Sequence, residues 1–139
     1  MRITLIRPPA YSAGMMGAQR VPLLGVAYIA AVARAAGHDV DIVDMCGEDI
    51  DRREKVHGDF FAHGLSLDAL KERLKPSDVI GITCMFSQDW PFHRAIIEKV
   101  KALQPDCVFV AGGEHVSAIP EFCLDDCPAL DACIGGEGE

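Results

Sequence analysis

The 139-residue chain lacks an excess of basic residues and a long apolar segment, and its first residues show no pattern that predicts a leader peptide. Lysine and arginine number 13 against 21 aspartate and glutamate residues, a formal net charge of −8. Phosphate backbones and anionic lipids are bound by positive charge, so neither nucleic acid nor a membrane is expected as a partner. The longest apolar stretch, residues 23–36, is shorter than the roughly 20 residues that cross a bilayer. With no signal-peptide pattern at the start, a cytoplasmic protein is expected.

The cysteines do not form the Cys-x-x-Cys pairs of zinc ribbons and thioredoxin-like sites. In a chain without a leader, the six cysteines are expected to be reduced, and most of them to be small buried side chains. Cys123, Cys127 and Cys133 match the first gap of a Cys-x3-Cys-x2-Cys iron–sulfur motif but not the second. Cys133 also falls in a predicted buried strand, so no metal site is expected in this chain.

Strand and helix patterns alternate along the whole chain. Apolar β-rich runs predict strands at residues 3–6, 40–43, 79–84, 107–111 and 131–134. Helices are predicted at residues 23–36, 66–75, 90–103 and, as a short turn, 119–127. Residues 10–22 are predicted to be a loop, and residues 46–64 are ambiguous. Several strands are continuously apolar, which is typical of parallel strands covered on both faces. The prediction is an α/β, doubly wound, Rossmann-like (flavodoxin-like) sheet of five parallel strands in the order 2-1-3-4-5.

Two helices differ in how much of their surface is apolar. In the helix at 90–103, Phe92, Ile96, Val100 and Leu103 form one apolar stripe. The helix at 23–36 is apolar all round, which favours a second cover from a dimer mate, another domain or a large ligand, although an exposed alanine-rich surface is an alternative.

The doubly wound pattern calls for a helix after the last strand, and the sequence ends at Glu139 before one. Residues 1–139 are therefore expected to be one domain, the N-terminal part of a longer protein. The final helix is missing, and the open sheet edge favours self-association.

The residues after each predicted strand exclude several ligand classes, because ligands of such sheets bind beyond the carboxyl ends of the strands. Pro8 and Pro9 follow the first strand, lack amide donors and replace the glycine-rich loop of dinucleotide sites. The third strand lacks the terminal aspartate of a phospho-acceptor domain, and a flavin loop is matched only weakly at residues 12–14. The remaining crevice is apolar and edged by residues 83–87 and 112–113, which suits a large, weakly charged ligand. A simple tight turn is the alternative reading of the two glycines.

Five short segments occur in the order and spacing of a known family. They are Pro22-Leu-Leu-Gly-Val-Ala-Tyr-Ile-Ala-Ala31, Gly37-His-Asp-Val40 leading to Asp44, Ile80-Gly-Ile-Thr83, Gly112-Gly-Glu-His115 and Gly135-Gly-Glu-Gly-Glu139. Together they resemble the cobalamin-binding N-terminal domain of cobalamin-dependent radical S-adenosylmethionine (SAM) enzymes, over nearly the whole chain.

The resemblance implies a domain that binds cobalamin (vitamin B12) with the nucleotide tail inserted along the sheet. The candidate cofactor-binding residues are Pro8, Pro9, Leu24, Gly25, Thr83, Cys84, Met85, Phe86, Ser87, Gly112, Gly113, Glu114, His115, Gly135, Gly136 and Glu137. In the family a C-terminal barrel with a [4Fe-4S] cluster and S-adenosylmethionine follows, and it carries out methyl transfer, skeletal rearrangement or cyclisation. None of that machinery lies in these residues, so the chain alone is expected to bind and not to catalyse.

The chain departs from methionine-synthase-type domains, because it has no Asp-x-His-x-x-Gly motif to supply a histidine below the cobalt. No protein histidine is therefore expected as the lower ligand, and His38 is expected to belong to a turn at the opposite edge of the sheet. Cys84, Met85 and Gln88 remain possible neighbours of the lower face of the corrin. Two other functions also stay open: a stand-alone corrinoid carrier, and a flavodoxin-like interaction domain without a cofactor.

Overall fold

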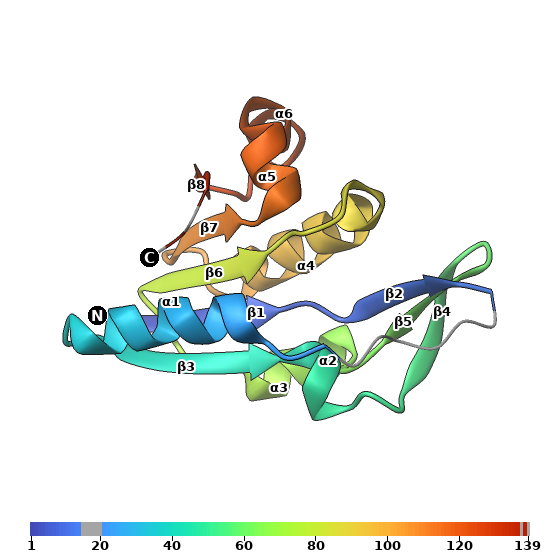
Figure 1. Cartoon of the computed structure of the whole chain (residues 1–139), viewed down its shortest axis with the longest axis horizontal. Coiled ribbons are helices and arrows are strands. Elements are labelled where there is room, and N and C mark those ends of the chain that lie inside the picture. Colours follow the sequence, from blue (N-terminus) through green and yellow to red (C-terminus); the bar gives the residue numbers. More distant parts are fainter. Residues whose placement is uncertain (15–20, 137, 139) are drawn as a thin grey trace.

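A five-stranded parallel sheet forms the centre of the computed structural model, which describes residues 1–14, 21–136 and 138 (Figure 1). Its strands lie in the spatial order β3-β1-β6-β7-β8, and every neighbouring pair is parallel. The strands are β1 (Arg2–Arg7), β3 (Asp39–Asp44), β6 (Val79–Thr83), β7 (Val108–Gly112) and β8 (Ala132–Ile134). Numbered along the chain without the strands of the smaller sheet, this order is 2-1-3-4-5, and the predicted fold class and strand order are confirmed.

Helices cover the two faces of this sheet unequally (Figure 1). One face carries α1 (Leu24–Ala35), which packs on β1 and β3 through a small core that includes Val26 and Ala30. The other face carries a much larger core, in which Ile6, Ile80 and Phe109 are completely buried. The helices on that larger core are α3 (Leu67–Arg73), α4 (Trp90–Leu103), α5 (Glu114–Ala118) and α6 (Pro120–Asp126). On the α1 side of the sheet, β6 and β7 have no helical cover among the described residues.

A second, antiparallel sheet extends from the carboxyl end of β1 (Figure 1). It consists of β2 (Ala10–Ala13), β5 (Phe60–His63) and β4 (Arg53–His57) in the order β2-β5-β4. The predicted loop at residues 10–22 is therefore wrong for its first four residues, and two strands lie in the stretch that was ambiguous. The pairing joins segments about fifty residues apart, which a local sequence pattern does not reveal.

Short-range signals set the helix boundaries well. Gly37 has φ of 86° directly after α1, a conformation that glycine adopts without strain. The Ser66 side chain accepts a hydrogen bond of 3.1 Å from the Ala69 N–H and caps α3. The sequence did not predict α5, the short turn α2 (Met45–Glu48) or the 3-10 turn η1 (Ser87–Asp89). In the described chain, no helix follows β8, and none has the length and apolar character of a membrane span.

The apolar faces of α1 and α4 differ from the expectation in detail. In α4 the buried face includes His93 and Ile97 beside Ile96 and Val100, whereas Leu103 is 39% exposed. The predicted stripe was thus wrong at Leu103, whereas Phe92 is half-buried. In α1 three large apolar side chains stay largely exposed in the single chain, and these are Leu24, Tyr28 and Val32. The described residues supply no second cover for this helix.

Candidate functional site

A slot of about 390 Å³ lies on the α1 side of the sheet, near the carboxyl ends of β1, β6 and β7. Its walls are mainly apolar side chains, among them Leu5 from β1, Val26 and Ile29 from α1, and Val110 from β7. Polar groups are few, and Thr83, Glu114 and Ser117 supply them. An apolar cleft with a small number of polar groups is the usual form of a site for a small organic ligand.

Glycines in the strands keep the floor of the slot free of side chains. Gly81 lies in the middle of β6, where an added Cβ would come within 3.0 Å of Leu5 Cδ2. Gly112 ends β7, and its added Cβ would be 3.6 Å from the Ile134 carbonyl oxygen, an ordinary contact. A ligand can therefore approach the main chain of both strands closely. At this carboxyl edge, between β1 and β6, the chain reverses its winding direction, which is where open α/β sheets bind ligands.

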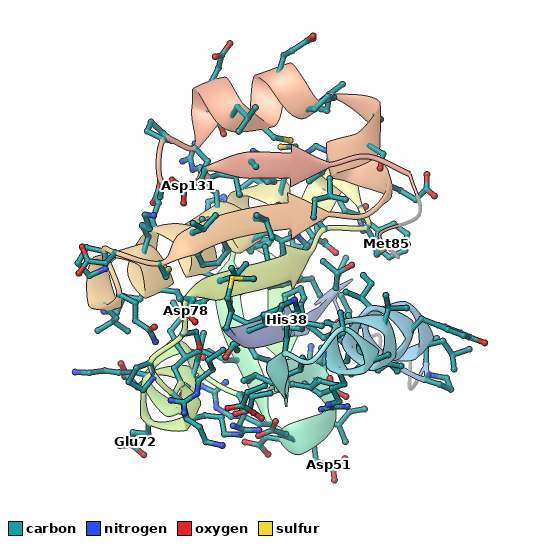
Figure 2. All side chains as sticks on the ribbon, turned by 90° about the vertical axis from the view of Figure 1, so that its left-hand side faces the viewer. His38, Asp51, Glu72, Asp78, Met85 and Asp131 are labelled. Atoms are coloured by element: carbon teal, nitrogen blue, oxygen red, sulfur yellow. The ribbon has the colours of Figure 1, made fainter. Side chains whose placement is uncertain are left out.

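The structure brings seven of the sequence-predicted residues together around the slot. They are Gly25, Thr83, Met85, Gly112, Gly113, Glu114 and Gly136. Figure 2 separates His38 and Asp78, at the amino end of the sheet, from Met85 at the carboxyl end.

The remaining predicted residues do not line the slot, for different reasons. Pro8 and Pro9 are buried where the chain leaves β1, and Cys84 is completely buried behind Gly113. Leu24, Phe86 and Gly135 are exposed outside it. Ser87 and His115 contact each other, and Glu137 lies outside the described residues.

Sequence reasoning missed most of the apolar walls of the slot. The missed residues are Leu5, Ile6, Val26, Ile29, Gly81, Ile82, Val110, Ser117, Ile134 and Gly138. A buried parallel strand is apolar on both faces, so its sequence does not reveal which side chains face the slot. Gly81 did carry a usable signal, because a glycine inside a strand often marks a close backbone approach.

Gly113 is required for a different reason from the one that the sequence suggested. Its φ is 104°, and an added Cβ would lie only 2.6 Å from the carbonyl oxygen of Cys84. The Cys84 N–H in turn donates a 2.7 Å hydrogen bond to the Gly112 carbonyl. A side chain at position 113 would therefore strain the backbone, so the tight turn that was the alternative for the two glycines explains Gly113 better than its place at the edge of the crevice alone.

Buried titratable groups gather at the same end of the sheet, on the α4 side. Burial lowers the pKa of His93 to about 4, aided by neighbouring His115, and raises the pKa of Asp89 to about 6. His93 Nδ1, Asp89 Oδ1 and His115 Nε2 have no hydrogen-bond partner in the part of the chain that the structure describes. Tyr11 from β2 lies over this group, with its ring 5.8 Å from that of His93. The unpartnered atoms favour the neutral forms of all three groups.

Three cysteines lie near Cys84, and the four thiols do not form a metal site. Burial raises the pKa of the Cys84 thiol, and the neighbouring thiols of Cys123, Cys133 and Cys127 raise it further. Burial likewise raises the pKa of Cys123 to about 11. The described residues contain no group of three or more histidine, cysteine or acidic side chains arranged to hold a metal ion. These thiols are protonated packing groups at neutral pH.

The strand order and the glycine-floored slot at the carboxyl edge define a ligand-binding domain of the flavodoxin-like type. A sequence model of the B12 binding domain family matches residues 17–139. The chain belongs to this family and is a cobalamin-binding domain.

Three curated proteins illustrate the wider similarity. The chain is 38% identical over 120 residues to the cytidylyl-2-hydroxyethylphosphonate methyltransferase of Streptomyces wedmorensis, covering 84% of the chain and 22% of that protein. It is 32% identical over 143 residues to the anaerobic magnesium-protoporphyrin IX monomethyl ester cyclase of Rubrivivax gelatinosus, covering 100% of the chain and 23% of that protein. An uncharacterized methyltransferase of Pyrococcus horikoshii is 31% identical over 144 residues, covering 100% of the chain and 27% of that protein. The chain thus spans about a quarter of the length of these relatives.

Proposed function

We propose that the slot between α1 and the strands β6 and β7 holds the nucleotide tail of cobalamin, with the macrocycle at the carboxyl edge beside Met85. The observation that carries this proposal is the floor made by Gly81 and Gly112, which leaves room for a flat ring system against the main chain. A volume of about 390 Å³ is near the lower end of ordinary ligand sites, so the slot suits a part of so large a cofactor and not the whole.

The polar residues of the slot fit the chemistry of such a tail. Thr83 and Ser117 offer hydroxyl groups, and Glu114 offers a carboxylate, for the hydroxyl and amide groups that a corrinoid carries. The apolar walls of the slot exclude water from the base of the nucleotide tail. Bound cobalamin would supply cobalt-centred group transfer, and the chain's residues bind it, orient it and shield it.

We further propose that this domain serves a longer radical SAM enzyme of the methyltransferase or cyclase type. Two features support this: the methyltransferase and cyclase activities in the names of the relatives, and the chain's quarter share of their length. A [4Fe-4S] cluster and S-adenosylmethionine would belong to the rest of such a protein. A cytoplasmic, reducing setting agrees with six free cysteines, five of them buried.

The test compares two corrinoids that differ in the tail. The purified chain is titrated with hydroxocobalamin and, separately, with cobinamide, which has the same macrocycle without the nucleotide. Binding of hydroxocobalamin with a shift of the corrin absorption bands is expected, and cobinamide should bind at least tenfold more weakly. Equal affinities would refute the tail assignment, and no binding of either corrinoid would refute the proposed function.

A further inference from the structure

The segment between β6 and α4 carries the side chain that stands at the mouth of the slot. Met85 lines the slot and is 47% exposed, and its neighbour Phe86 is 63% exposed. Neither side chain is buried enough to fix the segment by its own packing. What holds this segment therefore decides how well the mouth of the slot is formed.

The end of β7 and the first turn of α5 hold this segment through three hydrogen bonds. The Cys84 N–H donates to the Gly112 carbonyl at 2.7 Å, and the His115 N–H donates to the Cys84 carbonyl at 3.2 Å. Beyond these two main-chain bonds, a side-chain hydrogen bond of 2.9 Å joins His115 Nδ1 to Ser87 Oγ. The last bond acts on the far side of Met85 and Phe86, so the two residues lie between anchored neighbours.

His115 is itself held firmly. It is only 4% exposed, and its ring lies 5.1 Å from the Trp90 ring. The Trp90 indole N–H donates to Asp126 in α6 at 2.9 Å, which fixes the tryptophan in turn. His115 does not line the slot, and its second ring nitrogen is buried without a partner among the described residues. The imidazole is thus a rigid internal anchor that holds Ser87, two residues beyond the slot residue Met85.

We infer that His115 is a positioning residue for corrinoid binding, which acts through Ser87 to hold Met85 at the mouth of the slot. The inference rests on the proposed function of the slot, and it gives His115 a role that needs no contact with cobalt. Losing one hydrogen bond of this kind should weaken corrinoid binding roughly three- to tenfold.

The first experiment needs no cofactor. The methionine methyl groups of the chain are labelled with ¹³C and observed by NMR in the wild type, His115→Ala and Ser87→Ala. In both variants the Met85 signal should move toward its unstructured position and sharpen, while the signal of fully buried Met45 should not change. His115→Asn keeps a hydrogen-bonding group near Nδ1 and should restore the Met85 signal. An unchanged Met85 signal in both alanine variants would overturn the inference.

The second experiment measures hydroxocobalamin binding by the same variants. Each alanine variant should lose roughly three- to tenfold in affinity, and the double variant should lose no more than either single one, because both remove the same bond. The absorption spectrum of bound cobalt should be the same in all variants, with His57→Ala on exposed β4 as the matched histidine control. A changed axial spectrum in His115→Ala would show a cobalt ligand and overturn the inference. If the wild type binds no cobalamin, the proposed function fails, while the NMR experiment still decides the positioning role.

Discussion

Replacing Gly25 by leucine should block the slot while leaving the fold more stable. Gly25 is the second residue of α1 and lines the slot, and an added Cβ would meet no atom within 4 Å. Leucine is favoured over glycine in a helix by about 0.8 kcal/mol, so the free energy of unfolding should rise slightly. In the complex, the new side chain would compete with the ligand. Overfilling a packed site costs about 1–3 kcal/mol, which corresponds to a roughly tenfold to hundredfold loss of hydroxocobalamin affinity.

The matched control for this prediction is Ala31→Leu. Ala31 also lies in α1 and is exposed, but it is not part of the slot. Both variants are compared by thermal unfolding and by absorbance titration with hydroxocobalamin. Ala31→Leu should bind as the wild type does. Wild-type affinity in Gly25→Leu, at unchanged or raised stability, would refute the assignment of the slot.

Four further predictions concern the backbone, two buried titratable groups and the thiols. Gly113→Ala should lower the free energy of unfolding by about 2–4 kcal/mol, because φ is 104° and the added Cβ would lie 2.6 Å from a carbonyl oxygen. The control is Gly135→Ala, whose added Cβ would meet no atom within 4 Å. It should change the free energy of unfolding, measured by denaturant titration, by under about 0.5 kcal/mol. The pKa of His93 is lowered to about 4, so as the pH falls below about 6.5 this imidazole is protonated first in the unfolded chain. The free energy of unfolding should therefore fall between pH 6.5 and 4, by up to roughly 3 kcal/mol. The raised pKa of Asp89, about 6, acts in the opposite sense, because the folded state takes up that proton first as the pH falls. The loss of unfolding free energy with falling pH should therefore be smaller in His93→Gln and larger in Asp89→Asn than in the wild type. Identical pH profiles of stability would contradict both assignments. Because five of the six thiols are buried, a thiol reagent should modify the native chain slowly, beginning with half-buried Cys133. Rapid reaction of Cys84 would contradict the burial of this thiol behind Gly113.

The main sheet was predictable because its signals are local. Each central strand is a short apolar run, and the proline and glycine residues that end the strands and helices lie next to the elements they end. The small antiparallel sheet was not predictable in the same way. β4 is fully exposed and mostly polar, and Ala10–Ala13 becomes a strand only by pairing with β5. Tyr11 then stacks on Phe92 at 4.6 Å, a contact between distant parts of the chain.

The candidate site divides in a similar way. The resemblance located Gly25, Thr83 and Gly112, which lie where the chain turns at the carboxyl edge. It also named Cys84 and His115, which are adjacent in sequence to slot residues but point into the larger core. Neighbouring residues of a strand or of a helix point in different directions, so a motif identifies the right segment and leaves the choice of side chains to the fold.

The unequal division of the interior into two cores has a thermodynamic consequence. The large core on the α4 side is complete in the protein alone, so the polypeptide can acquire its architecture before any vitamin arrives. The small core beneath α1 ends at the slot, and an inserted base would extend it as an additional piece of packing. Occupancy would then raise the melting temperature in proportion to the logarithm of the corrinoid concentration, and the added protection should concentrate in α1 and β7.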